Sequence, residues 1–255
     1  MYLNKSDYTD KIFHLDNLKL LQTLPSQCVD LIYCDILYNT GRKFDDYEDN
    51  LGTPQEAIQW YLPRFTEMHR ILKDTGLIYI HCDYNLSHYI KVLMDLIFGI
   101  NNFRNEIIWW YNSAPRKKKD FGKRHDTIFR YSVSDKYYFN DDSKYIRQEY
   151  SKTAPRGYEK EKYYDSRGKV IDDVWKINML GQNDKTERVG YSTQKPKELF
   201  YKIIDSSCPK DGIVADFFCG SGTACVVAKE LGRSYIGCDI SEKAVNITKE
   251  RLSKI

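Results

Sequence analysis

One short segment, Asp216-Phe-Phe-Cys-Gly-Ser-Gly-Thr223, constrains the fold more than any other part of this sequence. It follows an apolar run at 212–218 that is typical of a buried strand, and it opens a helical pattern at 223–231. Glycines between a strand and a helix permit a tight turn and the close approach of a ligand to the helix N-terminus. A second strand, 234–239, ends at Asp239, where such folds hold ribose hydroxyls. The segment therefore predicts a β-α-β unit that binds an adenosine-containing ligand.

The residues around this turn narrow the choice of ligand. Gly220 and Gly222 match the first two glycines of the dinucleotide pattern Gly-x-Gly-x-x-Gly, but Cys225 replaces the third. Asp216 would repel a pyrophosphate, whereas it suits a positively charged ligand such as S-adenosylmethionine. No Gly-Lys-Ser/Thr follows the turn, which excludes a Walker-type phosphate loop. A strand–turn–helix without a ligand and a nicotinamide-dependent oxidoreductase are the alternatives at this point.

The rest of the chain alternates strand-like and helix-like segments, which favours an α/β fold with a mostly parallel sheet. Strands are predicted at 29–34, 77–81 and 105–111, and helices at 54–72, 85–98 and 241–253, with Gly76 ending the first helix. The alternation fails at 112–172, which we interpret as an insertion between two halves of one sheet. We therefore predict one α/β domain whose two halves, 1–111 and 173–255, are separated by an insertion at 112–172. The length of 255 residues suits one large domain.

Several function classes are disfavoured by composition. No apolar run approaches the 18 residues of a membrane span, and the N-terminus lacks the apolar segment of a secretory signal. Seven scattered cysteines indicate reduced thiols, so we expect a cytoplasmic protein without membrane contact. The five histidines show no zinc-binding spacing, so no metal site is expected, and His81 is interpreted as a core residue.

The net charge of +3 conceals an uneven distribution. Residues 112–169 contain 16 Lys and Arg against 9 Asp and Glu, a net of +7, so the remainder carries −4. Basic residues of this kind supply salt-dependent affinity for nucleic acid phosphates. A solvated loop is the alternative interpretation of such a charge run.

The segment Asp35-Ile-Leu-Tyr38 follows the predicted strand 29–34. An acid and an aromatic residue at the carboxyl end of a parallel strand lie where open α/β sheets bind ligands. The segment resembles the Asp-Pro-Pro-Tyr motif of the β class of amino-group-specific DNA methyltransferases, in which the catalytic motif precedes the cofactor motif. The segment 216–223 resembles that family's Asp-Pro-Phe-x-Gly-Ser-Gly-Thr. Further segments similar to the family are His14-Leu-Asp-Asn17, Asp172-Asp-Val-Trp175, Glu187-Arg-Val-Gly190 and Thr193-Gln-Lys-Pro196.

The resemblance implies a Rossmann-like S-adenosylmethionine-dependent methyltransferase fold with an inserted target recognition region at 112–172. It implies methyl transfer to the exocyclic amine of a base flipped out of double-stranded DNA. Asp35 and the carbonyl of Ile36 would accept hydrogen bonds from the amine, and Tyr38 would stack on the base. We call the four residues Asp35–Tyr38 the tetrad. Its first residue, Asp35, favours adenine N6 as the methylated atom, with cytosine N4 as the alternative. RNA in place of DNA is a variant of this substrate.

The resemblance also assigns binding residues and partners. The implied cofactor residues are Asp16, Thr193, Lys195, Asp216, Phe218, Gly220, Gly222, Thr223 and Asp239. The implied DNA-binding residues are Arg116, Lys117, Lys118, Lys119, Lys123 and Arg124. A homodimer and a cognate restriction endonuclease are further expected partners.

This sequence departs from the family motif where Ile36-Leu37 replaces Pro-Pro and Phe217 replaces a proline. Because proline fixes φ, its loss predicts a catalytic loop that is less pre-organised. A catalytically silent, nucleic-acid-binding relative is therefore the second class of function that the sequence allows.

Overall fold

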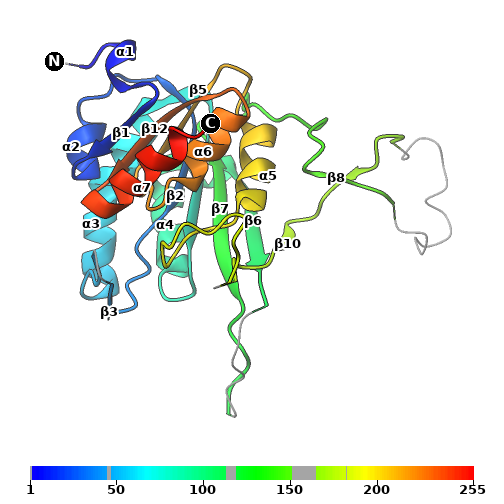
Figure 1. The fold of residues 1–255 in the computed structure, drawn as a ribbon, viewed down its shortest axis with the longest axis horizontal. Helices are drawn as coiled ribbons and strands as arrows, with labels where there is room; N and C mark the ends of the chain where they lie inside the picture. Colours follow the sequence, from blue (N-terminus) through cyan, green and yellow to red (C-terminus); the bar gives the residue numbers. More distant parts are fainter. Residues whose placement is uncertain (1, 45–46, 113–118, 151–164, 182) are drawn as a thin grey trace.

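A central sheet of eight strands organises the protein in the computed structural model, which describes residues 2–44, 47–112, 119–150, 165–181 and 183–255 (Figure 1). Its strands are β1 (Lys11–His14), β2 (Val29–Asp35), β5 (Leu72–Cys82), β6 (Phe103–Trp110), β7 (His125–Ser132), β10 (Val174–Lys176), β11 (Ile213–Asp216) and β12 (Ser234–Asp239). Two small hairpins pair β3 (Arg42–Lys43) with β4 (Glu48–Asp49) and β8 (Arg147–Gln148) with β9 (Lys169–Val170). The helices are α1 (Lys5–Tyr8), α2 (Asn17–Leu21), α3 (Pro54–Ile71), α4 (Ser87–Phe98), α5 (Lys197–Ser207), α6 (Thr223–Glu230) and α7 (Glu242–Leu252), with a 3-10 turn at Ile100–Asn102.

The strand order is β1-β12-β11-β2-β5-β7-β6-β10, and only β7 runs antiparallel to its neighbours. The predicted α/β class with a mostly parallel sheet is therefore confirmed. The order places β11 beside β2, although about 180 residues separate them in the chain. From this pair the chain winds outward in both directions, so the carboxyl ends of β2 and β11 meet at a topological switch point, where α/β sheets bind ligands.

Helices cover both faces of the sheet. Alternate residues of each strand point to opposite faces, and the residues on both faces are apolar and must be buried. Ile32 and Cys34 of β2 pack against α2, α3 and α4, whereas Leu31 and Tyr33 pack against the side covered by α5, α6 and α7. The strands are apolar on both faces, as buried parallel sheets require.

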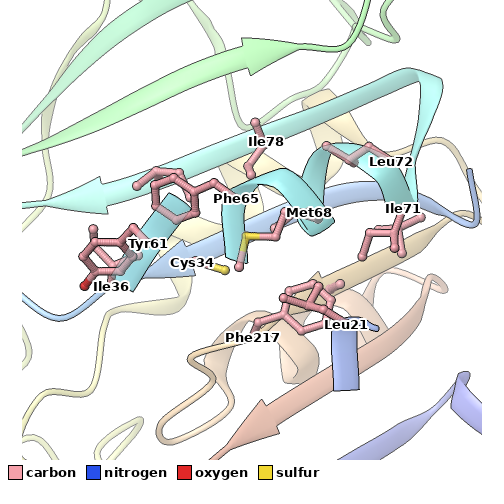
Figure 2. Packing of buried hydrophobic residues seen from close by; sticks show 14 of the residues in the cluster. Leu21, Cys34, Ile36, Tyr61, Phe65, Met68, Ile71, Leu72, Ile78 and Phe217 are labelled. Carbon is pink, nitrogen blue, oxygen red and sulfur yellow. The ribbon is translucent and has the colours of Figure 1, made fainter. Parts of the chain in front are cut away.

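Helix α3 shows how the local sequence sets the packing. Thr53 and Glu56 form a capping box at its start, with Pro54 at the first helical position. Its buried face includes Tyr61, Phe65, Met68 and Ile71, spaced at three and four residues, and Figure 2 shows these side chains against the sheet. The face extends to Ile36, so α3 packs directly beneath the segment that follows β2.

The predicted element boundaries need two corrections. Gly76 does not end α3: the helix stops at Ile71, and Leu72 already begins β5, in which Gly76 lies. Residues 125–132 fall inside the range interpreted as an insertion, yet they form β7 between β5 and β6 in the central sheet. The described parts of 112–172 that leave the sheet are therefore two separate arms.

The two arms start at opposite edges of the sheet. The first follows the carboxyl end of β6 and returns to the start of β7, at the edge where β2 and β11 end. The second follows the carboxyl end of β7, which points the other way, and contains the β8–β9 hairpin; Figure 1 shows it projecting to the side of the molecule. Only the first arm leaves the sheet at the switch-point edge.

Candidate functional site

Asp35 is the last residue of β2 and ends at the switch point. One of its carboxylate oxygens, Oδ1, accepts a hydrogen bond from the Tyr38 hydroxyl at 2.5 Å. The other, Oδ2, forms an ion pair with Lys195 Nζ, which comes from the segment before α5. Asp35 and Lys195 were assigned separately to the catalytic and cofactor groups, and the structure brings them into direct contact.

Hydrogen bonds hold the segment that follows Asp35. The Ile36 N–H donates to the carbonyl of His81 at 3.1 Å, and the buried Tyr61 hydroxyl donates to the carbonyl of Leu37 at 2.8 Å. Figure 2 shows Tyr61 and Ile36 together at one end of the core cluster. The sequence predicted a loosely organised loop here because the prolines are missing, but these bonds restrain the same two residues by other means.

The next residues of the loop are fixed by Asp49. Its carboxylate accepts hydrogen bonds from the backbone N–H groups of Asn39 and Thr40 at 2.9 and 3.0 Å, and from the Thr40 hydroxyl at 2.5 Å. Asn39 has a φ of 55°, an uncommon left-handed conformation that Asn tolerates better than most residues. The β3–β4 hairpin thus anchors the far side of the tetrad.

A network of polar side chains surrounds the tetrad. Asp126, near the start of β7, accepts from the Tyr111 hydroxyl at 2.9 Å, from His81 Nε2 at 3.1 Å and from the Tyr38 hydroxyl at 3.5 Å. The other ring nitrogen of His81, Nδ1, lies 2.7 Å from the Tyr33 hydroxyl. Residues of β2, β5 and β7, together with Tyr111 directly after β6, therefore meet around Asp35.

The glycine turn joins the neighbouring strands. Gly220 has a φ of 50°, and its N–H donates to Asp239 Oδ2 at 2.8 Å. Gly222, with a φ of 72°, packs so closely against α7 that a Cβ would lie 2.2 Å from Thr248 Cγ2. Both positions therefore require glycine: the backbone conformation is left-handed, and at Gly222 there is no room for a side chain.

Three carboxylates lie at this edge of the sheet. Asp35, Asp216 and Asp239 end the adjacent strands β2, β11 and β12. Burial raises the pKa of Asp216 well above its ordinary value, and the charges of Asp35 and Asp239 raise it further. A cation bound here would offset this repulsion, because it favours the ionised carboxylate.

The remaining predicted cofactor residues have varied surroundings. Asp16 caps α2 through backbone N–H groups and forms an ion pair with Arg64 at 2.9 Å. The ring centroids of Phe218 and Trp60 lie 6.1 Å apart. The side chain of Thr193 forms a hydrogen bond with Tyr47. Thr223 is buried and accepts from Arg251 at 2.9 Å. The roles of these residues toward a cofactor stay predictions.

Three of the predicted DNA-binding residues, Lys119, Lys123 and Arg124, are described and lie in the arm at the switch-point edge. Lys123 Nζ lies 3.6 Å from the centre of the Tyr84 ring, and Arg124 donates to Asn112 at 3.0 Å. Lys119 is exposed. Arg116, Lys117 and Lys118 lie outside the described residues. The described basic residues thus lie on the same edge as Asp35.

Sequence reasoning missed Asp126, Tyr61 and Asp49, and placed His81 in the core without a role. His81 is fully buried, but both ring nitrogens have polar partners. The signal that could have found Asp126 is its acidic side chain directly before the strand-like run at 127–131. In the described part of the chain no group of His, Cys, Asp and Glu is arranged to hold a metal ion, and no helix there is long and apolar enough to cross a membrane.

Comparison with known proteins places this arrangement in a family. The chain is 31% identical to the type II methyltransferase M.HpaI of Haemophilus parainfluenzae over 92% of this chain and 71% of that enzyme. It is 30% identical to the DNA adenine methyltransferase YhdJ of Escherichia coli, over 94% of this chain and 82% of that enzyme.

Solved structures share the fold. The PvuII DNA methyltransferase, described as cytosine-N4-specific, superposes with a TM-score of 0.70 at 15% identity, covering 94% of this chain and 85% of that one. The complex of M1.HpyAVI with S-adenosylmethionine superposes with a TM-score of 0.62 at 21% identity, covering 95% of this chain and 98% of that one. These likenesses confirm the Rossmann-like methyltransferase fold.

A family model described as DNA methylase, of the N6 and N4 type, matches residues 29–250 and thus spans the tetrad, the Lys195 segment and the glycine turn. The resemblance inferred from the motifs is therefore confirmed: this chain belongs to the N6/N4 DNA methylase family.

Proposed function

We propose that this protein transfers a methyl group from S-adenosylmethionine to the exocyclic amine of a base in double-stranded DNA, and that the base is adenine, modified at N6. The observation that carries the proposal is the meeting of Asp35 with Lys195 and Asp216 at the switch point. It unites the tetrad and the cofactor turn in one site. Cytosine N4 is the alternative, since the relatives and fold neighbours include enzymes described for each base.

The residues at the cofactor turn fit S-adenosylmethionine. A sulfonium and an ammonium group carry positive charge, and the buried Asp216 lies in the field of two further carboxylates. Asp216 and the backbone of Gly220 and Gly222 would hold the methionine part, Asp239 the ribose and Asp16 the adenine amine. When bound, this cofactor supplies an electrophilic methyl group on sulfur.

The chain's own contribution is positioning and electrostatics. Asp35 and the carbonyl of Ile36 accept hydrogen bonds from the target amine, which directs the nitrogen lone pair away from the ring. Oriented acceptors of this kind lower the barrier without a covalent intermediate, because they meet the charge that develops during transfer. Tyr38 stacks on the flipped base.

The route of DNA to this site follows from the arm at the switch-point edge. Lys119, Lys123 and Arg124, together with Arg116, Lys117 and Lys118, contact phosphates and hold the duplex over Asp35. Such contacts position a duplex but carry no sequence information. A homodimer, a cognate restriction endonuclease and a cytoplasmic location stay predictions that the structure leaves untested.

The decisive experiment incubates the protein with tritiated S-adenosylmethionine and either double-stranded DNA or RNA, digests the product and identifies the labelled nucleoside. We expect N6-methyladenine from DNA. N4-methylcytosine would correct the base, and label in RNA alone would correct the substrate. No label at all, with cofactor binding intact, would indicate the silent relative and contradict the proposal.

A further inference from the structure

Oδ1 of Asp35, an acceptor for the target amine in the proposed reaction, already accepts a hydrogen bond within the protein. The Tyr38 hydroxyl donates to Oδ1 at 2.5 Å, while Lys195 contacts Oδ2. A carboxylate oxygen in a short hydrogen bond is a weaker acceptor for a second donor, because part of its charge is already neutralised. Asp35 therefore accepts the target amine best when the Tyr38 hydroxyl has another partner.

Asp126 offers that partner. Its Oδ2 lies 3.5 Å from the Tyr38 hydroxyl oxygen, which is thus placed between two carboxylates. Burial raises the pKa of Tyr38 well above its ordinary value, and Asp35 and Asp126 raise it further. The hydroxyl therefore stays protonated. It is placed to donate its hydrogen bond to one carboxylate or the other.

Asp126 is built to stay in place and stay charged. Tyr111 donates to its Oδ1 at 2.9 Å, and His81 Nε2 lies 3.1 Å from its Oδ2. Because an ionised carboxylate only accepts, Nε2 of His81 carries a hydrogen. Burial opposes ionisation of Asp126, but His81, Lys195 and Tyr111 outweigh it and lower the pKa of this carboxyl.

We propose that Asp126 is a positioning residue that accepts the Tyr38 hydroxyl while Asp35 accepts the target amine. The exchange needs only a small movement of one hydroxyl group, since both carboxylates already flank it. It leaves the ring of Tyr38 available for stacking and frees Asp35 Oδ1. This role rests on the proposed methyl transfer, in which Asp35 receives the amine.

A double-mutant cycle between Asp126→Asn and Tyr38→Phe tests the role. Asp126→Asn replaces one acceptor oxygen with an NH2 group and removes the negative charge, so the hydroxyl favours Asp35. We expect kcat to fall about tenfold, equivalent to about 1.4 kcal/mol. KM for DNA and cofactor should change less than about twofold. In the Tyr38→Phe background no hydroxyl competes for Asp35, so Asp126→Asn should lower kcat by less than about twofold.

Asp95→Asn is the matched control, because Asp95 also accepts a tyrosine hydroxyl, that of Tyr131 at 2.6 Å, but lies on α4 away from the site. Its kcat should equal that of the unchanged protein. If Asp126→Asn fails to fold, Asp126→Glu repeats the cycle with the charge kept and the acceptor moved by about one bond length of ~1.5 Å.

The outcomes separate the two proposals. No methyl transfer by the unchanged protein would refute the proposed function. If the protein is active but the Asp126 substitution lowers kcat by the same factor in the Tyr38 and the Tyr38→Phe backgrounds, only the role of Asp126 is refuted. A purely structural effect does not depend on the Tyr38 hydroxyl. Unchanged kcat in the Asp126 variant would refute it as well.

Discussion

Replacing Tyr61 with phenylalanine tests whether hydrogen bonds replace the missing prolines of the tetrad. Tyr61 is fully buried, and its hydroxyl donates to the Leu37 carbonyl at 2.8 Å. Tyr61→Phe leaves that carbonyl without this donor, and an unsatisfied buried group costs about 1–3 kcal/mol. Because Leu37 is only partly buried, water can reach part of the site. We therefore expect the free energy of unfolding to fall by about 1–2 kcal/mol.

The catalytic effect should exceed the loss of stability. The Leu37 carbonyl lies between Ile36 and Tyr38, so a shifted peptide misplaces both groups that face the base. Misplacements near 1 Å cost up to about a hundredfold in rate, and we expect kcat to fall roughly tenfold or more. Urea unfolding gives the stability, and methyl transfer at saturating DNA and cofactor gives kcat.

Tyr79→Phe is the matched control. Tyr79 is equally well buried and its hydroxyl lies 2.7 Å from Ser207 Oγ, on the face of the sheet covered by α5. Its removal should cost about 0.5–1.5 kcal/mol of stability and leave kcat unchanged. If the two variants lowered kcat equally, the loop would not depend on the Tyr61 bond, and the reasoning would be refuted.

Two further predictions concern binding. Because burial and neighbouring carboxylates raise the pKa of Asp216, a cationic cofactor should lower it again; binding then releases protons and strengthens as pH rises. Calorimetry in two buffers of different ionisation enthalpy should show this release, and Asp216→Asn should abolish it; equal enthalpies would contradict it. Neutralising Lys117, Lys118 and Lys119 together should flatten the salt dependence of DNA affinity by up to about 0.9 in log–log slope per lost phosphate contact. An unchanged slope would place the DNA elsewhere.

The fold was predictable wherever a local pattern carries the information. The glycine turn, the capped helix α3 and the apolar strand β2 each follow from a few adjacent residues, and all appear close to their predicted bounds. Strand β7 was assigned to the insertion and not to the central sheet because Asp126 and Arg130 occupy buried positions in it and interrupt the apolar pattern that marks a central strand.

The site was predictable only in part, for a different physical reason. Asp35 and Asp216 could be named because each ends a recognisable strand. The pairing of Asp35 with Lys195 joins residues 160 positions apart, and His81 meets Asp126 across 45. Such contacts depend on strand order, which the sequence pattern does not encode locally. The Tyr61 bond likewise requires knowing that α3 packs beneath the tetrad.

The most direct test of the central claim, that Asp35 is the group that receives the target amine, is the activity of Asp35→Ala measured together with cofactor binding. Methyl transfer to DNA should be abolished while S-adenosylmethionine still binds with nearly unchanged affinity, because Asp216 and the glycine turn remain. Calorimetry and transfer of a tritiated methyl group measure the two on the same sample. Normal methylation by the variant would contradict the account.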